Sequence, residues 1–148
     1  MNEDKTKLVK FSRNEFRQGK KQGVFDFLGF TFYWGRSRKG CVILKLKTSA
    51  KKKRLKLKRV NEWAKGIRSK VSLKDIWKTF RSKLAGHIRY YGVSHNLKPV
   101  EAFICRSEWI LFKWLNKRSQ RKSFTWERYQ MFVKQYPLPK AKIYHPLF

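Results

Sequence analysis

The stretch CVILKLKTSA, residues 41–50, contains the change of hydrophobic period that decides the fold. Before the change, Val42, Leu44 and Leu46 recur at every second position, which places them on one face of a β-strand. After Thr48, apolar residues recur three and four positions apart, which is the spacing of an amphipathic helix. We therefore expect an α+β chain, with a β element first and helices after it.

The β element is expected to be a hairpin. Residues 24–34 are dense in Phe and other β-forming side chains, residues 35–40 (GRSRKG) form a polar loop bounded by glycines, and residues 41–47 resume the strand pattern. Upstream, residues 7–11 predict a short strand that leads into a basic loop through Lys20-Lys21. Because an isolated two-stranded hairpin is marginally stable in water, the first residues, the helices or a missing partner must cover its apolar side.

Four apolar patterns after the hairpin predict helices. The first follows Thr48 or Ser49 as N-cap, the second follows Ser72, the third begins near Pro99, and a short fourth begins at Thr125. Their apolar stripes comprise Leu57, Val60, Trp63, Ala64 and Ile67; Leu73, Ile76, Trp77, Phe80, Leu84, Ile88 and Tyr91; Val100, Phe103, Ile104, Leu111, Trp114 and Leu115; and Trp126, Tyr129, Val133 and Tyr136. Helices with such stripes cannot bury them singly, so we expect them to pack as a small bundle.

The expected architecture is an N-terminal β-hairpin followed by a bundle of three to four helices. We place the hairpin segment in residues 1–48, the bundle in 49–136 and an extended tail in 137–148, because the sequence PLP at 137–139 stops the last helix.

The charge of the chain limits its partners. Thirty-eight Lys and Arg oppose nine Asp and Glu, for a formal net charge of +29. So much like charge repels itself unless a polyanion neutralises it. We favour nucleic acid over an anionic membrane surface, because the basic residues span several elements rather than one amphipathic helix. The start of the chain lacks an apolar leader, and no apolar run approaches the ~20 residues of a membrane span, so we expect a cytoplasmic protein without membrane contact.

The metal-binding residue types are scattered. Cys41 and Cys105 have no CxxC partner, and His87, His95 and His145 lie far apart without HxxxH or HExxH spacing. We therefore expect neither a metal nor another cofactor.

Four segments in a fixed order carry a family resemblance. They are FDFLGFTF (25–32), KLAGHIRYYG (83–92), LFKWLNKRS (111–119) and PLPKAKI (137–143), and Lys5-Thr6-Lys7 precedes the first. Together they resemble the end of the palm and the thumb or maturase-specific domain X of bacterial group II intron reverse transcriptases/maturases. The resemblance covers nearly the whole chain. It implies a primer-grip-like motif at Phe27, Leu28, Gly29 and Phe30, and a helical thumb that binds intron RNA and template–primer and assists splicing.

The chain departs from this family at the polymerase centre. The family needs a Tyr-x-Asp-Asp pair and a further Asp to hold two metal ions, whereas the only aspartates here are Asp4, Asp26 and Asp75, none of them adjacent to another. We therefore expect no catalytic residues and no reverse transcription by this chain alone. The missing fingers and palm would have to come from a separate polypeptide.

The candidate RNA-contacting residues form four groups. They are Arg36, Arg38 and Lys39 on the hairpin turn; Lys51, Lys52, Lys53, Arg54, Lys56, Lys58 and Arg59 on the first long helix; Arg89 and Tyr90; and Lys113, Lys117, Arg118, Arg121 and Lys122 near the end of the third. Most runs of charged residues only form a solvated helix face. In the 51–59 run, however, no acidic residue occurs before Glu62, so ion pairs within the helix cannot account for these cations. The last group also complements a helix dipole. Tyr90 lies off the apolar stripe and is a candidate for base stacking, whereas Tyr91, Trp63, Trp77 and Trp114 are assigned to packing.

Three functions remain open from the sequence. A maturase-type RNA-binding module is the leading hypothesis. A generic architectural DNA-binding protein and a non-functional remnant of a truncated reverse transcriptase are the alternatives.

Overall fold

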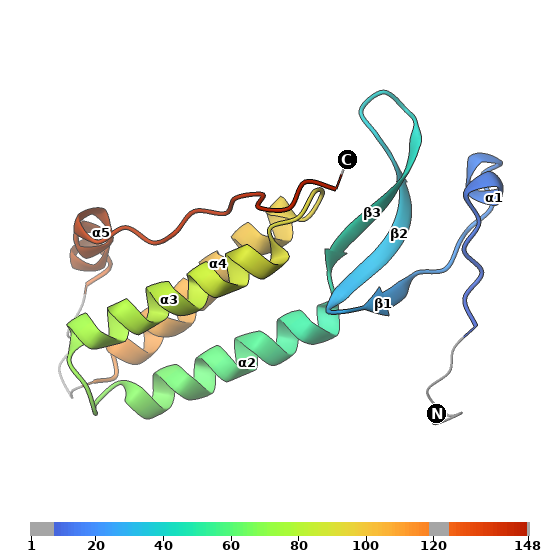
Figure 1. Ribbon diagram of the computed structural model, residues 1–148. Helices are drawn as coiled ribbons and strands as arrows, with labels where there is room; N and C mark the ends of the chain where they lie inside the picture. Colours follow the sequence, from blue (N-terminus) through green and yellow to red (C-terminus); the bar gives the residue numbers. More distant parts are fainter. Residues whose placement is uncertain (1–7, 119–124, 148) are drawn as a thin grey trace. The chain divides into compact units, whose positions relative to one another are not determined.

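The chain was analysed as a computed structural model, which describes residues 8–118 and 125–147. It divides into two compact units, Met1–Ser49 and Ala50–Phe148. The first holds a three-stranded antiparallel sheet and a short helix, and the second holds four longer helices (Figure 1). The expected α+β class is confirmed.

The sheet contains one strand more than the predicted hairpin. Its strands are β1 (Phe25–Phe27), β2 (Phe30–Arg36) and β3 (Val42–Thr48), in the order β1-β2-β3. The predicted pairing of the two β-rich runs is confirmed, since β2 pairs with β3. The expectation of a single strand over residues 24–34 was wrong, because the run folds back on itself at a two-residue turn.

That turn lies in the primer-grip-like motif. Phe27 pairs with Phe30, so Leu28 and Gly29 are the two turn residues, and both have positive φ, at 51° and 84°. Positive φ at both central positions defines the type I′ turn, whose twist matches that of the flanking strands. Glycine meets this demand without strain, whereas leucine rarely does. The unusual turn residue explains why the sequence reads as one continuous strand.

The first described residues cover the sheet. The ring of Phe11 stacks on Trp34, with 4.9 Å between centroids, and meets the ring of Phe25 edge-on at 5.0 Å. The strand expected over residues 7–11 is absent from its described part, 8–11, and the loop expected after it contains a helix, α1 (Arg13–Arg17). Helix α1 forms because the Ser12 side chain accepts a hydrogen bond from the Glu15 backbone N–H.

The second unit contains α2 (Ala50–Ile67), α3 (Leu73–Tyr91), α4 (Leu97–Leu115) and α5 (Trp126–Gln135). The predicted N-cap of α3 is confirmed, since the Ser72 side chain accepts from the backbone N–H three residues later. Helix α5 follows Thr125, where a helix was expected to begin, and the Thr125 side chain accepts from the Arg128 backbone N–H. Helix α4 begins two residues before Pro99, which therefore lies in the first turn, where its missing N–H costs no hydrogen bond.

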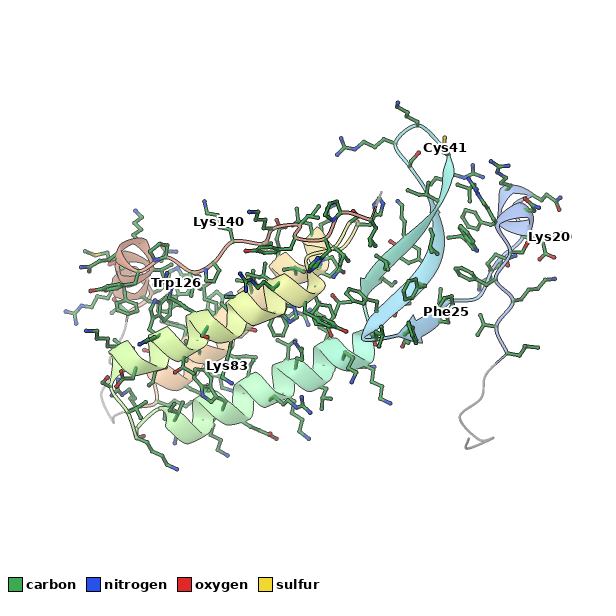
Figure 2. All side chains as sticks on the ribbon, in the orientation of Figure 1. Lys20, Phe25, Cys41, Lys83, Trp126 and Lys140 are labelled. Carbon is green, nitrogen blue, oxygen red and sulfur yellow. The ribbon has the colours of Figure 1, made fainter. Side chains whose placement is uncertain are left out.

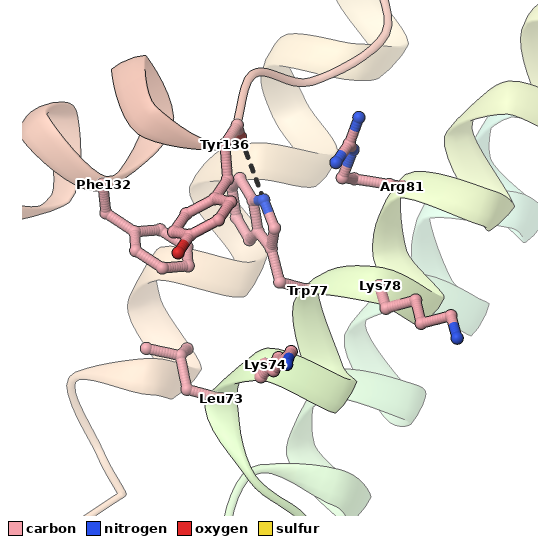
Figure 3. A pocket seen from close by; sticks show the side chains of 7 residues that line it. All are labelled: Leu73, Lys74, Trp77, Lys78, Arg81, Phe132 and Tyr136. Carbon is pink, nitrogen blue, oxygen red and sulfur yellow. Dashed lines mark hydrogen bonds between the residues drawn. The ribbon is translucent and has the colours of Figure 1, made fainter.

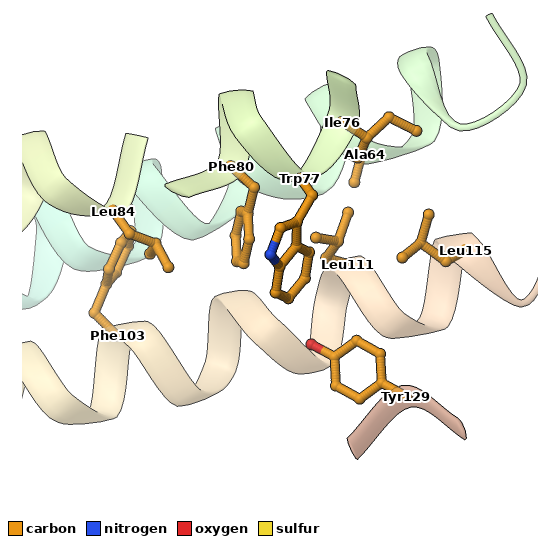
Figure 4. Packing of buried hydrophobic residues seen from close by; sticks show 9 residues of the cluster. All are labelled: Ala64, Ile76, Trp77, Phe80, Leu84, Phe103, Leu111, Leu115 and Tyr129. Atoms are coloured by element: carbon orange, nitrogen blue, oxygen red, sulfur yellow. The ribbon is translucent and has the colours of Figure 1, made fainter. Parts of the chain in front are cut away.

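Apolar residues from all four helices form the core (Figure 4). Its fully buried members are Ala64, Ile76, Trp77, Phe80, Leu84, Phe103, Leu111, Leu115 and Tyr129. Trp63 and Trp114 pack against this cluster but stay partly exposed. The hydroxyl of Tyr129 donates to Glu108 Oε1 at 3.1 Å, so the one polar atom of this buried ring has a partner.

The tail after α5 is tied to α3 by hydrogen bonds. The Trp77 indole N–H donates to the Tyr136 carbonyl at 3.0 Å, and the backbone N–H groups of Tyr144 and His145 both donate to the Gly92 carbonyl. Gly92 caps α3, as expected, but its φ is −74°. Glycine is required here because a β-carbon would clash with the carbonyl oxygens of Lys142 and Ile88.

The Leu28 conformation gives a stability prediction. Replacing Leu28 with Asn should stabilise the sheet by about 0.5–1 kcal/mol, because Asn tolerates the left-handed region far better than Leu. Leu28→Val, with a β-branched side chain at the same φ, should destabilise it. Hydrogen exchange of the β2 amides measures the local free energy of opening in both variants. Equal protection in Leu28→Asn and Leu28→Val would contradict the assigned turn.

Candidate nucleic-acid interface

The basic run of α2, residues 51–59, lies mostly in the first half of the helix. Of the predicted contact residues in this run, Lys53 and Lys56 are half-buried and the rest are exposed, namely Lys51, Lys52, Arg54, Lys58 and Arg59. Side chains project from α2 along its whole length (Figure 2). Since Glu62 is the only acidic residue of α2, its charge is not balanced within the helix.

Lys56 differs from its neighbours because it contacts α3. Its Nζ lies 3.2 Å from His87 Nδ1 and 4.8 Å from the centre of the Tyr91 ring. Burial, followed by the nearby charges of Arg59 and Lys52, lowers the pKa of Lys56. This predicted RNA contact is therefore held against the aromatic face of α3.

His87 is the buried partner of Lys56. Its ring is stacked between Phe103, at 3.7 Å between centroids, and Tyr91, at 4.6 Å. Burial, assisted by the charge of Lys56, lowers the pKa of His87 to about 3. The imidazole is therefore neutral at physiological pH.

The predicted contacts on the hairpin turn lie in the first unit. Arg38 and Lys39 are exposed. Arg36 is exposed as well, but its Nη1 donates to the Gly40 carbonyl at 3.3 Å and its guanidinium lies 5.9 Å from the Phe16 ring. Arg36 thus stabilises the turn on which it lies.

At the end of α3, Tyr90 and Tyr91 have different environments. Tyr90 is 50% exposed and meets the Tyr91 ring edge-on, whereas Tyr91 is buried, as expected. The guanidinium of Arg89 lies 6.0 Å from the ring of Tyr144 in the tail. Arg89 and Tyr90 therefore present a cation and a ring at the same exposed helix end.

The cluster near the end of α4 is built around Trp114. Its ring has Lys113 and Lys117 at 5.0 and 5.1 Å, Lys65 of α2 at 5.9 Å, and Arg68, just after α2, at 4.9 Å. The negative face of the indole holds these cations close together without carboxylates. Arg118 instead donates to the Val71 carbonyl at 3.2 Å and links α4 to the α2–α3 connection. Arg121 and Lys122 lie outside the described residues.

A pocket of about 550 Å³ lies between α3 and α5 (Figure 3). Its walls are mostly apolar, since Trp77 meets the Phe132 ring edge-on at 4.9 Å and its indole N–H is occupied by the Tyr136 carbonyl. Three cations from α3 line it as well, and the full set of lining residues is Leu73, Lys74, Trp77, Lys78, Arg81, Phe132 and Tyr136.

Sequence reasoning missed this pocket. The spacing of Lys74, Lys78 and Arg81, four and three residues apart, places them on one face of α3. The sequence therefore contained a signal for a row of cations on α3 beside Trp77. It contained none for the aromatic wall from α5, because that wall depends on a tertiary contact.

A second exposed aromatic surface was also missed. The rings of Trp109 in α4 and Trp126 in α5 stack with 4.5 Å between centroids and are 53% and 39% exposed. Exposed, stacked rings of this kind accept unpaired bases in RNA-binding proteins.

No family model, curated protein or solved structure matches the chain. Within residues 8–118 and 125–147, no three His, Cys, Asp or Glu side chains are grouped so that they could hold a metal ion. In the same part of the chain, no helix combines the length and apolarity needed to cross a bilayer.

The buried, neutral His87 predicts a pH dependence of stability. As pH falls below the ordinary His pKa of 6.5, the unfolded chain takes up a proton at this residue, whereas the folded chain does so only near pH 3. The free energy of unfolding should therefore decrease over this window, by up to about 1.4 kcal/mol per pH unit from this residue. Urea unfolding at several pH values checks this, and the decrease should be smaller in His87→Phe. An NMR titration of His87 with its midpoint near 6.5 would show the prediction to be wrong.

Proposed function

We propose that this chain is a maturase-type RNA-binding module without reverse transcriptase activity of its own. The observation that carries the proposal is the pocket between α3 and α5, where the rings of Phe132 and Tyr136, packed beside the buried Trp77, adjoin the cations of α3. Unpaired bases stack on aromatic side chains while cations contact the backbone, which is the common mode of single-stranded RNA recognition.

The same pocket favours RNA over duplex DNA. Bases in a duplex are stacked and paired, so they reach an aromatic pocket only after costly unstacking, whereas loops and bulges of folded RNA offer unpaired bases. The basic face of α2 supplies the sequence-independent attraction to phosphates. Both surfaces belong to the helical unit, which is the part that resembles the thumb and domain X.

The family resemblance supplies the finer part of the proposal. It points to group II intron RNA as the partner, to assistance of splicing as the role, and to a separate polypeptide as the source of fingers and palm. A direct test compares binding of a structured group II intron RNA with that of duplex DNA of equal length at the same salt concentration. Preference for the RNA supports the proposal, while equal binding supports the architectural DNA-binding alternative. The chain alone should not extend a primer.

Neutralising the three pocket cations tests the site itself. The variant with Lys74→Gln, Lys78→Gln and Arg81→Gln should bind RNA more weakly, and the slope of log affinity against log salt should fall by about two, because each lost phosphate contact removes about 0.7. The matched control carries Lys98→Gln, Arg106→Gln and Lys140→Gln, which remove the same charge from exposed positions that do not line the pocket. Filter binding over a salt series measures both variants. If the control loses as much affinity as the pocket variant, net charge alone accounts for binding.

A further inference from the structure

A second, smaller cavity collects positive charge. Its volume is about 200 Å³, and residues of α2, α3 and α4 line it: Lys56, Arg59, Val60, Phe80, Lys83, Leu84, His87 and Phe103. These eight residues include three cations and no carboxylate. Cations held together around a partly desolvated space are unfavourable unless an anion joins them.

His87, which lines the cavity, fixes the position of Lys56. A lysine ammonium can only donate, so His87 Nδ1 must accept the hydrogen bond from Lys56, 3.2 Å away. In the neutral ring the proton then resides on Nε2. This Nε2 is buried and, within the described part of the chain, has no hydrogen-bond partner.

The donors around this cavity are held in place before any ligand arrives. The imidazole is clamped between the rings of Phe103 and Tyr91. Lys56 lies over the ring of Tyr91, and the Nζ of Lys83 lies 5.3 Å from the centre of the Trp63 ring. Fixed donors bind an anion without a further ordering cost.

We propose that this cavity is a phosphate-binding subsite that receives one backbone phosphate of a bound RNA. Lys56, Arg59 and Lys83 supply the charge and the hydrogen-bond donors, and His87 holds Lys56 in place by accepting its hydrogen bond. A phosphate group combines negative charge with several acceptor oxygens, as this donor set requires. At 200 Å³ the cavity is less than half the volume of the aromatic pocket, which suits a phosphate group rather than a base. The assignment of the phosphate to RNA rests on the proposed RNA-binding function.

The first experiment titrates the full chain with inorganic phosphate, at constant ionic strength with chloride as the balancing anion, and follows the ¹⁵N resonance of His87 Nε2. We expect a saturable shift. Lys83→Gln should weaken phosphate binding by about tenfold, since a hydrogen bond to a charged group is lost. His87→Phe should also weaken it, because Lys56 loses the acceptor that holds it at the cavity. Lys98→Gln, an exposed position on α4 outside the cavity, is the control and should bind as the native chain does. If His87→Phe does not fold, the phosphate affinity of Lys83→Gln, compared with that of the native chain and the control, tests the subsite.

The second experiment distinguishes the source of the phosphate. RNA should compete with inorganic phosphate for the His87 signal. Lys83→Gln should lower the salt slope of RNA binding by about 0.7–0.9, whereas Lys98→Gln, which has the same net charge, should leave the slope unchanged. Phosphate binding without competition by RNA overturns the RNA assignment and leaves a free-anion site. RNA binding with no effect of phosphate on His87 overturns the subsite and leaves the proposed function intact. Phosphate binding by a chain that fails to bind RNA leaves the subsite and overturns the proposed function.

Discussion

The packing of Trp77 is the interaction on which the helical unit depends. Its ring lies in the core beside Phe80 and Tyr129, and its N–H fixes the Tyr136 carbonyl at the end of α5. One side chain therefore joins α3, α5 and the start of the tail. Because α5 is only ten residues long, propensity alone cannot maintain it, and contacts of this kind hold it in place. The aromatic pocket exists because Trp77 keeps α5 beside α3.

In the described part of the chain, several cations lie against aromatic rings rather than against carboxylates. Four cations approach Trp114, one approaches Trp63 and one approaches Tyr91. A ring attracts a cation but does not neutralise it, so the charge remains available to a polyanion. Carboxylate partners would satisfy the same side chains and weaken their attraction to phosphates. The composition and the fold thus favour the same class of partner.

Local signals in the sequence predicted most of the fold. The caps at Ser72 and Thr125 and the apolar stripe of α3 are set by neighbouring residues, so periodicity finds them. The turn at Leu28 was missed because leucine is not a residue that favours positive φ. Only part of the candidate site could be predicted from the sequence. The basic run of α2 is local, whereas the inward position of Lys56 depends on His87, 31 residues away, and the pocket wall depends on a contact across 59 residues.

The tail contacts also have a consequence for local opening of the helical unit. The long helices hold one another by a buried apolar cluster as well as by hydrogen bonds. The end of the chain is held by hydrogen bonds between Tyr136 and Trp77, between His145 and Arg89, and between Leu147 and Ser94. Regions with few buried apolar contacts open first in native-state fluctuations. The end of α5 and the tail are therefore expected to open before the helix core, and a ligand bound in the aromatic pocket beside them slows that opening.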